Sequence, residues 1–338
     1  MDRAGLALPA ALALLGGCAI VPHHADQPAR KVRGPIPSRT LEPVKLTYLA
    51  FLPRRAATLP EKATEVSVLS AYGNIYESAQ EGGDLVDFDG EIWRTSLNLR
   101  QGLGPSADLE IVLPVVYATS GFLDGFIEDY HSFFGFPNGG RDDSPENGYD
   151  MVAQKNGTEA YHLEGNEVGF GDVPIVLTVA VQEEGPTRPA LALRGGIELP
   201  TGSETDGFGN GKVDYGLGFL AERSYGRWTA TGAVDWVDTQ SSDSFEQADV
   251  EANDGFDVQG GVEYRWNDDL SLLLGSVYTT SPTDDIDLEE ISGEMLSLDL
   301  GVAWDVGKGS RMLFVFSEDL ITQSAPDFTV MAGWTTSL

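Results

Sequence analysis

The sequence predicts an all-β protein: an antiparallel, up-and-down transmembrane β-barrel of about twelve strands, with a short helix in a long extracellular loop. Two observations carry this prediction. Segments of strictly alternating apolar and polar residues recur from about residue 64 to the C-terminus. The connections between these segments are alternately short and long, as they are in bacterial outer-membrane barrels.

The first 44 residues precede the barrel and form two parts. Residues 1–17 are predicted to be a signal peptide, with Arg3 ahead of an apolar stretch that is too short to cross a membrane. Residues 18–44 contain five prolines without any periodicity and are predicted to be an extended periplasmic tether. Residues 45–338 are assigned to the barrel.

Cys18 is the single cysteine, so it cannot form an internal disulfide. It follows Leu15-Gly16-Gly17, which resembles the lipobox of bacterial lipoproteins, in which the cysteine carries lipid. This resemblance implies a lipid anchor in the outer membrane. An ordinary signal peptide that is removed together with its cysteine stays open as the alternative.

The alternation is clearest at the C-terminus, where Phe328, Val330, Ala332 and Trp334 share one face of the segment. Twelve such segments are predicted, near residues 64–78, 89–102, 108–119, 170–183, 189–200, 212–222, 227–238, 255–266, 269–280, 294–306, 310–318 and 327–338. The connections after even-numbered segments are short, and those after odd-numbered segments, including 79–88 and 120–169, are longer. Short periplasmic turns and long outer loops would place both ends of the barrel on the periplasmic side.

The two faces of the segments carry different chemistry. All six tryptophans fall on the apolar register, as expected of an aromatic girdle, although a sandwich core would also place them there. The opposite face mixes charges of both signs with small residues, which suits a narrow polar lumen. The candidate lumen-lining residues are Arg94, Arg100, Asp108, Glu110, Arg194, Glu198, Asp214, Asp235, Glu263, Arg265 and Asp299.

The longest loop has apolar residues at helical spacing over residues 122–136. Three roles stay open for this helix: a plug in the barrel mouth, an element on the membrane surface, or a recognition element. The polar residues around it, Asp124, Glu128, His131 and Arg141, form either a binding constellation or solvated loop charge.

Several segments resemble the family of predicted Gram-negative outer-membrane barrels called domain of unknown function 3187. They are residues 89–94, the stretch 123–141, which is the most specific, and Gly169-Phe170-Gly171-Asp172 followed by residues 199–203. The resemblance implies a barrel in the outer membrane and no assigned activity. Outer-membrane barrels usually end in Phe or Trp, which their assembly machinery reads, whereas this chain ends in Leu338.

Composition narrows the class of protein. The chain of 338 residues has 53 acidic and 21 basic residues, a net charge of −32, which excludes nucleic acid as a partner. No uncharged apolar run reaches the roughly 18 to 20 residues of a membrane helix. The expected partners are outer-membrane lipid, the barrel assembly machinery and small solutes. No catalytic motif, metal site or cofactor site is predicted.

Three functions are compatible with this chemistry. The leading hypothesis is a narrow passive channel or a structural barrel for small solutes, with cations favoured because acidic rings disfavour anions. The second is an enzyme that modifies lipid or lipopolysaccharide, with His131 as its candidate residue. The third is a surface binding module that uses the acidic loops.

Overall fold

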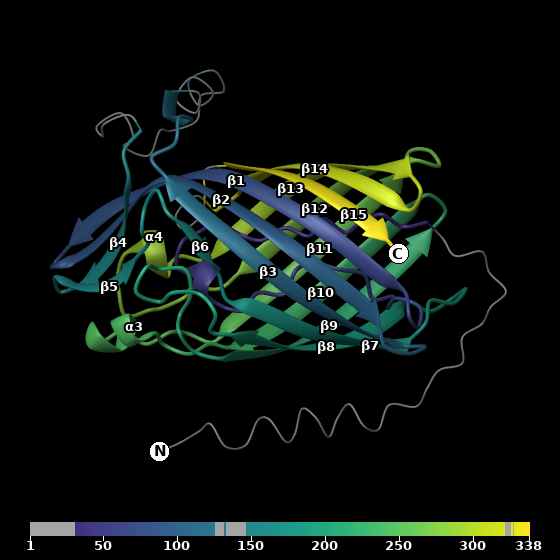
Figure 1. Ribbon diagram of the computed structural model, residues 1–338, viewed down its shortest axis with the longest axis horizontal. Helices are drawn as coiled ribbons and strands as arrows, with labels where there is room; N and C mark the ends of the chain where they lie inside the picture. The colour runs from purple at the N-terminus through teal and green to yellow at the C-terminus, as the bar shows by residue number, and fades with distance from the viewer. Residues whose placement is uncertain (1–30, 126–131, 133–146, 322–325, 327) are drawn as a thin grey trace, which may run out of the picture.

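The computed structural model describes residues 31–125, 132, 147–321, 326 and 328–338. Within them, twelve antiparallel strands form a closed barrel (Figure 1). Their order around the ring follows the chain, and β1 closes the barrel by pairing with β15 from Glu65↔Ser337 to Asn74↔Phe328. The twelve strands are β1 (Thr64–Glu81), β2 (Asp84–Gly102), β3 (Ala107–Thr119), β7 (Val173–Gln182), β8 (Ala190–Leu199), β9 (Asp214–Tyr225), β10 (Trp228–Asp238), β11 (Gly255–Arg265), β12 (Leu270–Thr279), β13 (Met295–Gly307), β14 (Ser310–Asp319) and β15 (Phe328–Ser337).

The predicted fold class is confirmed, and each predicted segment corresponds to one barrel strand. The short connections, residues 103–106, 183–189, 226–227, 266–269 and 308–309, all lie at one end of the barrel, called here the short-turn end. The longer connections lie at the opposite, loop end. This sorting arises because consecutive strands run in opposite directions and only alternate connections carry insertions.

One predicted loop is replaced by strand. Residues 79–88 do not form a long loop, because β1 and β2 continue pairing up to Glu81↔Asp84. Gly82 and Gly83, with φ of +66° and +140°, make the tight turn that joins them. Beyond the barrel rim, β2 also pairs with β4 (Asp150–Lys155), which pairs in turn with β5 (Thr158–His162). The small strand β6 (Val168–Phe170) pairs with β3.

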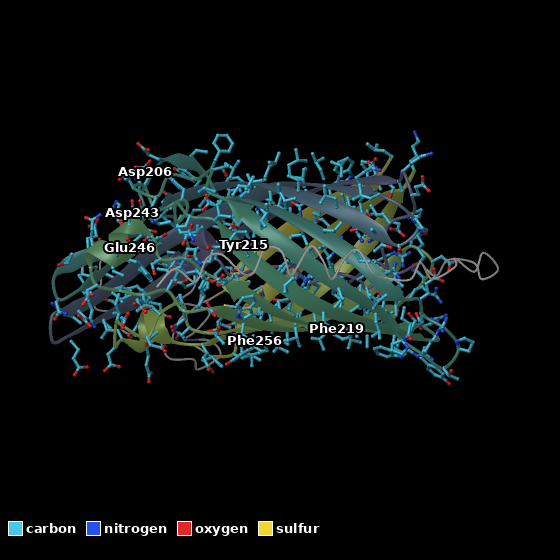
Figure 2. All side chains as sticks on the ribbon, turned by 90° about the horizontal axis from the view of Figure 1, so that it is seen from below. Asp206, Tyr215, Phe219, Asp243, Glu246 and Phe256 are labelled. Carbon is cyan, nitrogen blue, oxygen red and sulfur yellow. The ribbon has the colours of Figure 1, made fainter. Side chains whose placement is uncertain are left out.

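The outer and inner faces of the wall differ as predicted. On β13, Leu300, Val302 and Trp304 are 52%, 37% and 51% exposed, whereas the intervening Asp299 and Ala303 are buried and Gly301 lies against the interior. Large apolar side chains such as Phe219 and Phe256 cover the outside of the wall (Figure 2). An apolar surface that encircles the molecule would be unstable in water and suits lipid.

All six tryptophans point outward, each between 39% and 56% exposed. Trp228, Trp266, Trp304 and Trp334 lie toward the short-turn end, and Trp93 and Trp236 lie toward the loop end. Two separated levels of tryptophan fit the two interfaces of a membrane better than a sandwich core.

The helices of the described residues are short: η1 (Lys45–Thr47), α3 (Asp243–Gln247) and α4 (Glu289–Ser292). None of the helices described has the length and apolar character that a membrane crossing requires.

Candidate functional site: a plugged lumen

The lumen is filled by the segment that precedes β1. Residues 31–63, called here the plug hairpin, enter at the short-turn end, turn at η1 near the loop end, and return to begin β1 (Figure 1). No residue from 32 to 59 is exposed. The last part of the predicted tether, residues 31–44, therefore lies inside the strand ring rather than outside it.

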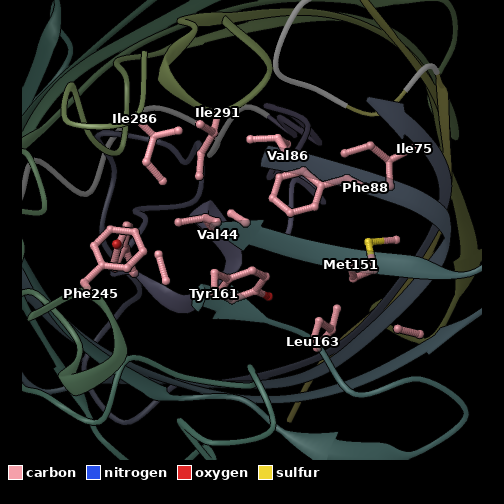
Figure 3. Packing of buried hydrophobic residues seen from close by; sticks show 14 of the residues in the cluster. Val44, Ile75, Val86, Phe88, Met151, Tyr161, Leu163, Phe245, Ile286 and Ile291 are labelled. Carbon is pink, nitrogen blue, oxygen red and sulfur yellow. The ribbon is translucent and has the colours of Figure 1, made fainter. Parts of the chain in front are cut away.

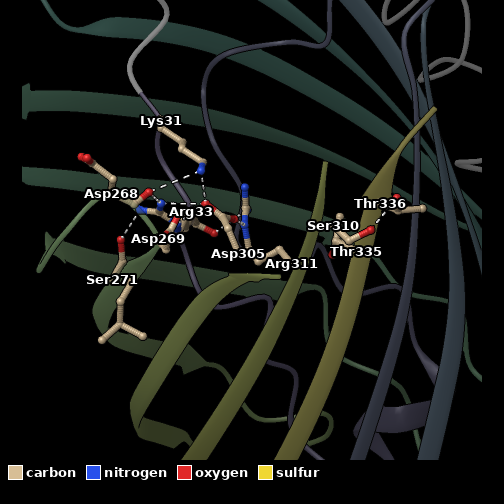
Figure 4. A network of polar contacts seen from close by, with 12 residues as sticks. Lys31, Arg33, Asp268, Asp269, Ser271, Asp305, Ser310, Arg311, Thr335 and Thr336 are labelled. Carbon is tan, nitrogen blue, oxygen red and sulfur yellow. Dashed lines mark hydrogen bonds and ion pairs between the residues drawn. The ribbon is translucent and has the colours of Figure 1, made fainter. Parts of the chain in front are cut away.

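Arg33 anchors the ascending limb at the short-turn end (Figure 4). Its side chain donates to Asp305 Oδ2 at 2.7 Å, to Ser271 Oγ at 3.0 Å and to the carbonyl of Asp268. The backbone N–H groups of Arg33 and Gly34 donate to Glu263 Oε2 at 2.8 and 2.9 Å. One wall carboxylate thus holds the plug backbone while another holds its guanidinium.

Two arginines anchor the descending limb. Arg54 donates to Asp108 Oδ1 and to Glu110 Oε2, both at 3.0 Å. Arg55 donates to both oxygens of Glu222, with Nε at 3.0 Å and Nη2 at 2.7 Å. Charge-assisted pairs of this kind are among the stronger hydrogen bonds, so they fix the register of the limb against β3 and β9.

A buried ion pair in the wall supports the middle of the descending limb. Arg194 and Asp235 side chains are both fully buried and bond through two contacts of 2.7 and 2.5 Å. Arg194 also donates to the carbonyl of Leu52 at 2.7 Å, and its guanidinium lies 4.8 Å from the ring centre of Phe51. Gln259 donates to the carbonyl of Phe51 at 2.6 Å.

Glycines in the wall leave recesses for plug side chains. A Cβ at Gly216 would lie 2.5 Å from the ring of Phe51, and one at Gly196 would lie 2.8 Å from it. A Cβ at Gly301 would lie 3.0 Å from Ile36. Glycine is needed at these wall positions because the plug occupies the space that a side chain would fill.

The tip of the plug is buried in an apolar cluster that closes the loop end (Figure 3). Val44 and Tyr48 pack there with Phe88 of β2, Tyr161 of β5 and Phe245 of α3. Burial raises the pKa of Glu42 and lowers the pKa of Lys45 beside this tip. The Lys45 N–H donates to Glu42 Oε2 at 2.5 Å, which helps to close the turn.

The remaining space in the lumen is unevenly distributed. A cavity of about 840 Å³ lies at the short-turn end between the two limbs of the plug and is lined by Arg33, Arg54, Arg55, Arg100, Glu110 and Glu222. Other cavities beside the plug have volumes of about 30 to 50 Å³, enough for a few water molecules. The described lumen is thus wide at the short-turn end and filled by the plug tip at the loop end.

The structure places the predicted lumen residues as follows. Arg94, Asp108, Arg194, Glu198, Asp214, Asp235, Glu263 and Asp299 are buried on the inner register of the wall, and Arg100, Glu110 and Arg265 share that register with partial exposure. Of these, Asp108, Glu110, Arg194, Asp214, Glu263 and Asp299 bond directly to the plug. Arg100 reaches it through the carbonyl of Ala57 at 3.2 Å.

The predicted loop constellation is only partly described. Glu128, His131 and Arg141 lie outside the described residues, as do most of the predicted helix and Cys18. Asp124 is buried, accepting from Asn74 at 3.1 Å and from the Asn147 N–H at 2.6 Å. Nearby Phe122 stacks on Tyr72, the outward neighbour of Trp93, so this end of the loop lies against the outside of the wall.

The acidic loops do not assemble a metal centre in the described part of the chain, where no group of three or more His, Cys, Asp or Glu side chains is placed to hold an ion. Asp206, Asp243 and Glu246 lie at the loop end (Figure 2). Asp243 pairs with Lys212 at 2.5 Å, which raises the pKa of that lysine.

The plug hairpin and its partners Glu222, Asp305 and Gln259 were missed by sequence reasoning. A charge signal marks the plug: residues 31–62 contain seven Lys or Arg against two Glu, a net charge of +5, within a chain of net charge −32. A basic segment ahead of an acidic barrel wall predicts attraction between the two.

This arrangement defines an outer-membrane-type β-barrel with an internal plug. The sequence profile of the family described as "Protein of unknown function (DUF3187)" matches residues 14–337, so the chain belongs to that family. No curated protein sequence matches the chain.

Two solved outer-membrane structures are similar to this chain. The COG4313 outer membrane channel from Pseudomonas putida F1 is similar over 86% of this chain and 100% of its own, with a TM-score of 0.56 and 14% identity. The NanC porin matches 81% of this chain and 100% of its own, with a TM-score of 0.46 and 8% identity.

Proposed function

We propose that this protein is a passive outer-membrane channel for small cationic solutes, and that the plug hairpin is its gate. The observation that carries the proposal is the polar lumen occupied by a segment that is held mainly through ion pairs and hydrogen bonds. A purely structural barrel has no need for a wide cavity at one end of its lumen. The likeness to a barrel described as an outer membrane channel supports the same class of function.

The proposed preference of the channel for cations follows from the wall carboxylates that the plug covers. Asp108, Glu110 and Glu222 are paired with plug arginines in the closed state. Withdrawal of the plug hairpin would leave Glu110 and Glu222 facing a water-filled lumen, and Asp108 would keep only its wall partner Arg100, at 2.6 Å. A ring of carboxylates attracts cations and repels anions.

The proposed orientation places the short-turn end in the periplasm and the acidic loops outside. Lys31, at the short-turn end, is thirteen residues after Cys18 (31 − 18), a span of up to about 45 Å when extended. A lipid anchor at Cys18 in the periplasmic leaflet is therefore within reach of the plug's entry point.

A disulfide staple tests the gate. A Cβ at Gly275 would lie 3.6 Å from Ile36 Cβ, within the range of about 3.5–4.5 Å that disulfides require. The variant Ile36→Cys/Gly275→Cys, in a Cys18→Ser background, is reconstituted in planar bilayers. We expect no conductance when oxidised and wild-type openings after reduction, with Ile36→Cys alone as the control.

Two results would count against the proposal. Equal conductance of the oxidised and reduced protein would show that the plug is not the gate. The absence of openings in the wild type, and in the reduced variant at any applied voltage, would reject the channel itself.

A further inference from the structure

The plug arginines occupy wall sites that are built for guanidinium groups. Glu222 is 2% exposed and receives Arg55 through two parallel hydrogen bonds. Asp108 is fully buried, and with Glu110 it receives the two Nη atoms of Arg54. Each site therefore offers two carboxylate oxygens to one planar cation.

This geometry selects guanidinium over ammonium. A guanidinium presents its N–H groups in a fixed planar fork that matches two acceptor oxygens, whereas an ammonium is a compact point charge. At the same end of the barrel Lys31 reaches a wall carboxylate through one ion pair, to Asp305 at 2.5 Å. The Arg55 site places a stricter geometric requirement on its ligand, because a cation that replaces Arg55 must donate to both oxygens of Glu222 at once.

The sites adjoin the space through which a solute would pass. Arg54, Arg55, Glu110 and Glu222 all line the cavity of about 840 Å³ at the short-turn end. This volume is comparable to that of binding pockets for small molecules. A solute in the cavity is therefore next to both arginine sites.

We infer that the wall carboxylates Glu222 and Asp108–Glu110 bind guanidinium groups of the transported solute, and that the plug hairpin is an internal mimic of that solute. The inference rests on the proposed channel function and names its cargo class: short, extended peptides that contain arginine. Such a peptide competes with the descending limb for the same carboxylates, so cargo binding and opening are coupled.

The chain offers a matched pair of variants for the test. Among the described contacts, the Glu222 carboxylate bonds only to Arg55. Arg55→Ala therefore vacates the site with its charge intact, and Arg55→Ala/Glu222→Gln vacates it without the charge. Both variants lose the same plug contact, so they differ only in the wall carboxylate.

The probe is the dipeptide arginyl-arginine, measured in two ways. Isothermal titration calorimetry on the full-length protein in detergent gives the dissociation constant without requiring conduction. We expect Arg55→Ala to bind at least tenfold more tightly than Arg55→Ala/Glu222→Gln and severalfold more tightly to arginyl-arginine than to lysyl-lysine. In bilayers, the same dipeptide should block the Arg55→Ala current at correspondingly lower concentration.

Specific outcomes overturn the inference. Equal affinity of the two variants would remove Glu222 as a binding group, and equal affinity for the lysine dipeptide would reduce the site to a general cation site. Arg55→Ala/Glu61→Gln, which neutralises an exposed acid at the same end, should bind like Arg55→Ala. Conduction without this affinity difference would support the channel function and reject arginine-containing peptides as the cargo. Calorimetric binding with this affinity difference but without any conduction would support the guanidinium site and reject the channel function.

Discussion

At the scale of single residues, the lumen is organised by buried charges whose partners come from both the wall and the plug. The Arg194 guanidinium donates hydrogen bonds to Asp235, to the Gln259 side chain and to the Leu52 carbonyl. Both charges of the Arg194–Asp235 pair are buried away from water. Their mutual hydrogen bonds, together with those from Arg194 to Gln259 and the Leu52 carbonyl, compensate for that cost. Removing one partner is therefore worse than removing both.

We predict that Arg194→Met lowers the unfolding free energy by about 3–5 kcal/mol, because Asp235 is left buried without its cation. Arg194→Met/Asp235→Leu should recover more than half of that loss. Urea unfolding followed by tryptophan fluorescence measures both. Lys62→Met, at an exposed pair with Glu61, should leave the unfolding free energy unchanged, and equal losses for the single and double variants would contradict the argument.

At the scale of elements, the plug hairpin is held both by ion pairs and by shape. Phe51 fits against Gly216 and Gly196, and Ile36 fits against Gly301. These recesses lie on different strands, so the wall is complementary in shape to one position of the hairpin. Filling one recess should dislodge the plug without touching any charge.

Gly216→Val is the variant that tests this fit. A side chain here overlaps the Phe51 ring and should cost about 1–3 kcal/mol of packing energy. We expect the plug to become accessible to trypsin, which would cleave after Arg54 and Arg55, whereas the wild-type plug resists. Gly260→Val is the control, because a Cβ at Gly260 meets no atom within 4 Å. Equal cleavage rates for the two variants would show that the recess does not hold the plug.

The strands were predictable and the plug was not, for a physical reason. A wall strand separates two solvents, so its sequence alternates with period two, as in Leu300 and Val302 against Asp299 and Gly301. A segment that is packed inside a lumen meets different neighbours at every residue, so residues 31–63 show no regular hydrophobic period. The register groups charged side chains on one face of each strand, but it does not predict their partners, because it does not reveal what fills the lumen.

At the scale of the whole molecule, charge is distributed along the barrel axis. The chain carries a net charge of −32, while residues 31–62, most of which lie inside the lumen, carry a net charge of +5. Acidic side chains such as Asp206, Asp243 and Glu246 gather at the loop end. A cation approaching from that end meets an attractive potential before it reaches the wall carboxylates.

Salt should weaken this long-range attraction. The screening length falls from about 10 Å at 0.1 M salt to about 3 Å at 1 M. We predict that the cation-to-anion permeability ratio of Gly216→Val, from reversal potentials in salt gradients, decreases severalfold over this range. Asp243→Asn/Glu246→Gln should lower the ratio at 0.1 M and have little effect at 1 M. A ratio independent of salt would assign selectivity to close contacts in the lumen alone.

Both ends of the plug hairpin lie at the same mouth of the barrel: Lys31 near Asp268, and Lys62 bonded through its N–H to the carbonyl of Gly102. The hairpin therefore enters and leaves the barrel through the same mouth, and the chain does not pass through the barrel from one end to the other. Drawing it out requires no wall strand to separate and no chain end to cross the lumen. The proposed opening would therefore be reversible and would leave the pairing between β1 and β15 intact.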